Sequence, residues 1–171
     1  EEDKLYKEGK IYTFTLRTIN KELADFFTKA LSNHFSNFVK GLTTEVKIIP
    51  KKLIDRIYTL TPLIIKTDMG YWKKHLSVDD FERRIKENLI KKYNKFHSTK
   101  LKEDFELYDA IEFKNKKPVS INYKNIKLLG DKISIKISDD PIAQELAYLS
   151  LGTGLGEANS RGFGFVNYKW F

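Results

Sequence analysis

The residues best suited to chemistry lie near the C-terminus, where five of the nine glycines fall within thirteen positions. The first three follow the pattern Gly-x-Gly-x-Gly from Gly152 to Gly156, and after five further residues Gly162 and Gly164 flank a phenylalanine. Glycine loses more backbone entropy on folding than any other residue, so such a cluster indicates positive φ angles or close approach to another group. Consecutive glycines also let backbone N–H groups approach phosphate oxygens. The segment predicts a loop built for contact, either with an anion or with the protein's own backbone.

Polar residues between the two glycine groups could add side-chain donors to a phosphate or a ribose. We expect the first two Gly-x-Gly steps to be mainly structural and Arg161 to be the residue most exposed to a ligand. The alternative is a purely structural joint that lets the last helix pack tightly on a sheet. A dinucleotide-binding loop is a poor match, because these glycines precede a strand-like run instead of joining a strand to a helix. The candidate binding residues of this segment are Gly154, Gly156, Asn159, Ser160, Arg161, Gly162 and Gly164.

Basic residues are concentrated in two stretches of a chain whose formal net charge is +8. Residues 83–102 hold eight basic residues and one acid, and residues 114–136 hold seven and one. Such a local excess favours a polyanionic partner with a phosphate backbone. The alternatives are an AT-biased genome, which favours Lys, Asn and Ile codons, and an ordinary solvated surface. The lysine candidates are Lys91 and Lys92 in a predicted helix, and Lys114, Lys116 and Lys117 in a predicted hairpin.

Three histidines are candidates for proton transfer, because imidazole titrates near neutral pH. His34 is expected near the end of a helix, His75 in a loop before the basic helix, and His97 just past that helix. No two of them stand at metal-ligand spacing, and the chain contains no cysteine. We therefore expect neither a metal site nor a cofactor.

Length and composition limit the class of protein. A chain of 171 residues, 41% of them hydrophobic, suits one globular domain or two small ones. No apolar run approaches the length of about 18 residues that a membrane-spanning helix needs. The first residues, Glu1-Glu2-Asp3-Lys4, do not resemble a signal peptide. We expect a cytoplasmic protein with no membrane partner.

The pattern of apolar residues and turn signals predicts a mixture of strands and helices. Strands are expected at residues 11–18, 44–49, 56–66, 107–113, 119–137 (with a turn at 130–131) and 164–170. Helices are expected after the capping residues Asn20, Ser77 and Asp139, the last with Pro141 in its first turn.

The order of these elements predicts an α+β fold. From residue 56 onward it is β-α-β-β-α-β, the arrangement of ferredoxin-like domains, which include RNA-recognition folds. Only β-α-β precedes it. We expect tandem ferredoxin-like units, with residues 1–52 forming the C-terminal half of a first, incomplete unit and residues 53–171 a complete second one. Because a half unit leaves a sheet edge unpaired, we expect a chain that lacks an N-terminal β-α-β segment, and a homodimer through that edge is a further expectation.

Two motifs carry a resemblance to a known family. Gly154-Leu155-Gly156, five residues ending in Arg161, and Gly162-Phe163-Gly164 stand between a last helix and a last strand. This pattern resembles the RAMP superfamily of CRISPR-associated proteins and is most similar to its repeat-RNA processing endoribonucleases. The segment Glu87-Asn88-Leu89-Ile90-Lys91-Lys92-Tyr93 is similar to an Asn-Leu-x-x-Lys-Tyr helix of the same family.

The resemblance implies tandem RRM-like units that bind CRISPR repeat RNA, with other CRISPR-associated proteins as further partners. It also implies that the intact protein cuts precursor CRISPR RNA into guide RNAs without metal, by attack of a ribose 2′-OH on the adjacent phosphate. The family's catalytic histidine comes from the first β-α-β half, so no catalytic residue is carried over to this chain. Two alternatives remain, a non-catalytic RAMP subunit of an effector complex and a ferredoxin-like module without a nucleic-acid partner.

Overall fold

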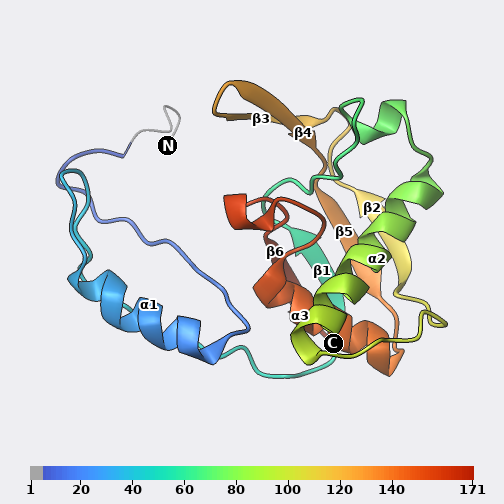
Figure 1. Ribbon diagram of the computed structural model, residues 1–171, viewed down its shortest axis with the longest axis horizontal. Coiled ribbons are helices and arrows are strands. Elements are labelled where there is room, and N and C mark those ends of the chain that lie inside the picture. The colour runs from blue at the N-terminus through green and yellow to red at the C-terminus, as the bar shows by residue number, and fades with distance from the viewer. Residues whose placement is uncertain (1–5) are drawn as a thin grey trace.

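Helices and strands fill most of the chain from residue 54 onward in the computed structural model, which describes residues 6–171 (Figure 1). The strands are β1 (Ile54–Thr59), β2 (Tyr108–Phe113), β3 (Val119–Tyr123), β4 (Ile126–Gly130), β5 (Ile133–Ile137) and β6 (Val166–Trp170). The helices are α1 (Lys21–Asn33), α2 (Val78–His97) and α3 (Pro141–Thr153), with short 3₁₀ turns η1 (Trp72–Lys74) and η2 (Asn159–Arg161). The structure is therefore α+β, as predicted.

The main sheet has four strands in the order β2-β5-β1-β6, and every neighbouring pair is antiparallel. Its elements follow one another in the chain as β1-α2-β2-β5-α3-β6, which is the β-α-β-β-α-β order expected from residue 56 onward. Between β2 and β5 the chain makes a separate two-stranded sheet, the β3–β4 hairpin. The hairpin is an insertion that the apolar pattern did not separate from the rest of residues 119–137.

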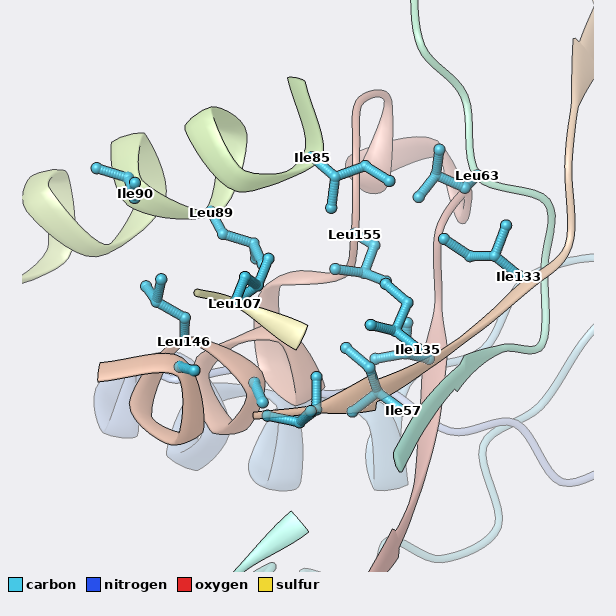
Figure 2. Packing of buried hydrophobic residues seen from close by; sticks show 14 of the residues in the cluster. Ile57, Leu63, Ile85, Leu89, Ile90, Leu107, Ile133, Ile135, Leu146 and Leu155 are labelled. Carbon is cyan, nitrogen blue, oxygen red and sulfur yellow. The ribbon is translucent and has the colours of Figure 1, made fainter. Parts of the chain in front are cut away.

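Helices α2 and α3 lie on one face of the main sheet, and the hydrophobic core fills the space between them (Figure 1). On α2, Phe81, Ile85 and Leu89 are fully buried, and their spacing of four residues puts them on one side of the helix. Figure 2 shows Ile85 and Leu89 facing side chains of the sheet, among them Ile135. Burial of each such side chain stabilises the folded state by about 1.5–3 kcal/mol, because its apolar surface is removed from water.

Side-chain caps define where the helices begin. Ser77 Oγ accepts a hydrogen bond from the backbone N–H of Asp80 (3.0 Å), which confirms the predicted cap of α2. The cap of α3 is Asp140 and not Asp139, since Asp140 Oδ1 accepts from the N–H of Ile142 (2.7 Å). The reason is that Pro141 occupies the first helical position, so the capping residue is the one directly before it.

The N-terminal region differs most from the prediction. Helix α1 forms with Asn20 as its cap, but the expected strands at 11–18 and 44–49 do not form. Neither segment pairs with another strand anywhere in residues 6–171. A strand needs a neighbour for its backbone hydrogen bonds, and alternation along a sequence cannot supply one. Figure 1 shows α1 standing apart from the sheet, and no residue of this helix is buried.

Two predicted strands are shorter than expected. The strand expected at 56–66 ends at Thr59, after which Leu63 and Ile64 make isolated bridges to Asp131 and Glu157. The last strand begins at Val166 instead of residue 164, where the backbone still has a left-handed φ of 63°.

Within residues 6–171, no helix combines the length and the apolar character that crossing a membrane requires.

Candidate nucleic-acid interface

The glycine loop (residues 152–164) is a tightly packed joint between α3 and β6. At Gly164 the φ angle is 63°, and a Cβ atom would lie 1.9 Å from the backbone oxygen of Leu155. Figure 2 shows Leu155 directed into the core, where it is fully buried. Only glycine at position 164 lets the backbone come this close to the backbone of Leu155. The spacing of the glycines in the motif therefore has a structural cause.

Backbone hydrogen bonds inside the protein occupy several amides of the loop. The N–H of Gly154 donates to Ser150 O (2.7 Å), and that of Gly164 donates to Pro62 O (2.9 Å). The N–H of Gly162 donates to Asn159 O (2.9 Å). Gly154, Gly156 and Gly164 are buried, whereas Ser160, Arg161 and Gly162 are exposed. These glycines shape the loop, and a ligand can reach it through η2.

Asn159 and Lys92 hold the loop from inside. Asn159 Nδ2 donates to the backbone oxygens of Leu155 (2.8 Å) and Phe163 (2.9 Å). Lys92 reaches from α2, and its Nζ donates to Asn159 Oδ1 (2.8 Å), Gly154 O (2.8 Å) and Gly156 O (3.0 Å). All three donors of the ammonium group are therefore engaged by the loop. Both side chains therefore stabilise the conformation of the loop through hydrogen bonds.

Burial lowers the pKa of Lys92 to about 8, partly opposed by the negative charge of Glu157. The ordinary value for an unfolded chain is 10.5, so between these two values the unfolded chain binds more protons at this position than the folded one. The free energy of unfolding must then rise with pH across this window, by about 1 kcal/mol per pH unit from this group. Below pH 8 the full cost of burying the charge is present.

Lys92→Met should remove this pH dependence. Urea unfolding between about pH 7.5 and 10 should show the wild type gaining stability relative to the variant as pH rises. Lys91→Met is the matched control, because Lys91 is exposed on the same helix, and its stability difference from the wild type should stay constant. A constant difference for Lys92→Met as well would contradict the assignment.

The exposed side of the loop meets the β3–β4 hairpin. The Arg161 Cζ atom lies 4.7 Å from the centroid of the Tyr123 ring, at the end of β3. The stretch from Lys114 to Gly130, which includes this hairpin, contains five lysines and no acidic residue. Arg161 thus brings the glycine loop into contact with a basic stretch that contains no acidic residue.

The remaining lysine candidates are all exposed but lie in different settings. Lys91 is on the outer side of α2, and Lys114 forms an ion pair with Glu112 (2.7 Å). Lys116 and Lys117 lie in the turn after β2. The prediction that this turn closes a β-hairpin is wrong, because β2 pairs with β5 and β3 pairs with β4. The turn instead carries the chain from one sheet to the other.

A buried carboxylate that the sequence did not reveal anchors the base of the β3–β4 hairpin. Asp131 is fully buried and accepts hydrogen bonds from Tyr71 Oη (2.8 Å), Trp72 Nε1 (2.7 Å) and Asn115 Nδ2 (2.8 Å). Lys73 Nζ lies 3.4 Å from it. Burial and the neighbouring carboxylate raise the pKa of Tyr71 above its usual range. Residues 130–131 carried only a turn signal, so nothing local in the sequence could have identified this network.

The three histidines lie in separate settings. His34 follows α1, His75 follows η1, and His97 is the last residue of α2, with its ring centroid 4.3 Å from that of Tyr93. In the part of the chain that the structure describes, no cluster of three or more His, Asp or Glu residues could hold a metal ion.

Comparison with known proteins relates this fold and loop to one family. The model of the family "CRISPR associated protein Cas6, C-terminal" matches residues 44–168, well over half of the chain. CRISPR-associated endoribonuclease Cas6 1 of Methanocaldococcus jannaschii is 28% identical over 198 aligned positions, which cover 94% of this chain and 74% of that protein.

Solved structures give the same relation. A structure described as CRISPR associated protein Cas6 has a TM-score of 0.53 and 28% identity, covering 73% of this chain and 52% of that one, so this chain spans about half its length. A Cas6 substrate mimic complex reaches a TM-score of only 0.40 at 14% identity, covering 70% and 54% of the two chains, which is too low to bear on function. The family match confirms the resemblance carried by the glycine run and the α2 motif. The chain belongs to the Cas6 family of CRISPR-associated endoribonucleases.

Proposed function

We propose that this chain binds CRISPR repeat RNA and is the C-terminal part of an enzyme that processes precursor CRISPR RNA. One observation carries the proposal. The exposed end of the glycine loop, at Arg161, lies against a β3–β4 hairpin that has no acidic residue. A loop typical of the family and a basic element thereby share one surface. Such a surface suits a phosphate backbone, because neutralising phosphates releases bound counterions.

We also propose the domain organisation that the element order supports. Residues 53–171 form one ferredoxin-like unit with the β3–β4 hairpin inserted, and residues 1–52 belong to a preceding unit. The main sheet order β2-β5-β1-β6, with both helices on one face, supports the first assignment. The exposed apolar side chains of the N-terminal region, such as Ile11 and Phe14, support the second, because a partner unit would cover them.

The proposed reaction is cleavage by attack of a ribose 2′-OH on the adjacent phosphate, which leaves a cyclic phosphate and needs no metal. It requires a general base for the hydroxyl proton and a general acid for the leaving oxygen. This chain's proposed contribution is to bind and orient the RNA through the glycine loop, the β3–β4 hairpin and exposed lysines such as Lys91, Lys116 and Lys117. Other CRISPR-associated proteins are proposed partners in the cytoplasm.

Binding of a labelled repeat RNA, measured between about 50 and 200 mM salt, tests the proposal. The affinity should fall steeply as salt rises, and Arg161→Ala should weaken binding and reduce the slope of log affinity against log salt by about one. Arg83→Ala is the matched control, because Arg83 is also exposed but pairs with Asp80 (2.9 Å) and Glu87 (2.7 Å). An affinity that is independent of salt would overturn the proposal.

Incubation of the longest natural form of the protein with repeat RNA and a chelator separates cleavage from binding alone. Products ending in a cyclic phosphate would support the proposed reaction. RNA that is bound in a salt-dependent manner but remains uncut would identify a binding subunit instead.

A further inference from the structure

Resting on the proposed function, we propose that Tyr123 and Arg161 together form a stacking site for one unpaired nucleobase of the RNA. Tyr123 is the last residue of β3, immediately before the two-residue turn of the β3–β4 hairpin. Arg161 lies in η2 of the glycine loop, 38 residues further along the chain. The fold brings this aromatic ring and this guanidinium to within 4.7 Å at the outer end of the hairpin.

The guanidinium of Arg161 makes no hydrogen bond to the described part of the protein, although it lies over the Tyr123 ring. Of the arginines in residues 6–171, Arg161 is the one whose side chain has no hydrogen-bond acceptor. The others donate to backbone oxygens, hydroxyls, amides or carboxylates: Arg17 to Val166 and Asn167, Arg56 to Ser134, Arg83 to Asp80 and Glu87, and Arg84 to Lys66. Arg161 therefore keeps its planar donor group available for a ligand.

Exposed backbone and further cationic side chains lie near the Tyr123–Arg161 pair. Arg161 is exposed, and at the following Gly162 a Cβ atom would meet no heavy atom within 4 Å. Lys124 Nζ lies 5.9 Å from the Tyr123 ring centroid, and Lys127 is exposed on β4. An aromatic ring that lies near an arginine and a lysine, on a hairpin without acidic residues, fits a base with its flanking phosphates.

The contact between Arg161 and Tyr123 is weaker than the stacking of a base on either group. A cation–π contact at an exposed position is weak, so the Arg161–Tyr123 pair contributes little to holding the loop against the hairpin. Stacking of a base on an aromatic ring or on an arginine plane is stronger and does not depend on which base is present. Stacking of a base can therefore offset the loss of the Arg161–Tyr123 contact. The site is expected to take an unpaired base, because a base inside a helical stem has both faces covered by the neighbouring base pairs.

The test uses repeat RNAs that carry the fluorescent base 2-aminopurine at successive unpaired positions. With the wild type, fluorescence should be quenched at one position, where the base stacks. Tyr123→Leu should abolish this quenching and weaken binding by about tenfold to a hundredfold, with an unchanged salt slope because no charge is removed. Tyr123→Phe should bind like the wild type. Phe38→Leu, which changes an aromatic residue that is 93% exposed in the N-terminal region, is the control for nonspecific loss of aromatic surface.

Arg161→Lys is a second test variant. Arg161 is exposed, so we expect the fold to tolerate this substitution. It keeps the positive charge, so the salt slope should remain, while the loss of the planar group should reduce the quenching. If the wild type binds RNA in a salt-dependent manner and Tyr123→Leu shows the same affinity and the same quenching as the wild type, this inference is wrong. The proposed function would then still stand. Absence of salt-dependent RNA binding by the wild type would overturn both.

Discussion

Gly164→Ala should lower the free energy of unfolding by about 4 kcal/mol, through backbone strain and overpacking acting together. The residue has a left-handed φ of 63°, which a side chain disfavours. The new Cβ atom would also lie 1.9 Å from Leu155 O and 2.9 Å from Asn159 Nδ2. Leu155 O is a backbone atom next to a buried side chain, so it cannot move without disturbing the core. Urea unfolding followed by circular dichroism measures the effect.

Gly162→Ala is the matched control in the same loop. Gly162 also has a left-handed φ, of 84°, but a Cβ atom there would meet no heavy atom within 4 Å. Only the conformational penalty of about 1–2 kcal/mol should then appear. If the two variants lower the free energy of unfolding by the same amount, a small shift relieves the close contact at Gly164. The description of the loop as a tight joint would then be wrong.

Asp131→Ala should destabilise the protein by about 3–5 kcal/mol, because it leaves buried donors without their acceptor. Tyr71, Trp72 and Asn115 all donate to this carboxylate, and Lys73 lies beside it. Asn115 also accepts from the N–H of Lys132 (2.6 Å), so its displacement would loosen the connection between the two sheets. Urea unfolding and the rate of proteolysis within residues 114–132 should both report the change.

Asp109→Ala is the control for loss of a carboxylate as such. Asp109 pairs with Lys136 (2.9 Å), but the pair is exposed to solvent, and its removal should cost less than about 1 kcal/mol. Similar losses for Asp109→Ala and Asp131→Ala would mean that the buried network does not support the hairpin.

Local signals in the sequence predicted the elements that depend on neighbouring residues. The cap of α2 at Ser77 follows from a hydroxyl three residues before Asp80, and its buried face follows from apolar residues four apart. Local signals also predict the order of helix, loop and strand around the glycines. The strands that they predict at residues 11–18 and 44–49 do not form, because a strand exists only when another strand pairs with it.

Some features of the candidate site could likewise be predicted from the sequence, and others could not. The glycine spacing and Arg161 could be recognised in the sequence because a tight joint leaves its pattern within thirteen consecutive residues. Lys92 could not be distinguished from Lys91 by type or position, although one is held inside the loop and the other is exposed. The side of α2 on which each lies decides the difference, and that depends on how α2 packs against the loop.

By itself the sequence determined the fold class, the helices and the caps of α1 and α2, the excess of positive charge and the motif that places the chain in its family. These properties depend on residue types and on short spacings. The tertiary structure alone decided that Lys92 supports the loop, that Asp131 accepts hydrogen bonds from two separate segments, and that Arg161 meets Tyr123. Each of these contacts joins residues that are far apart in the chain, so folding of the sheet and its helices had to bring them together.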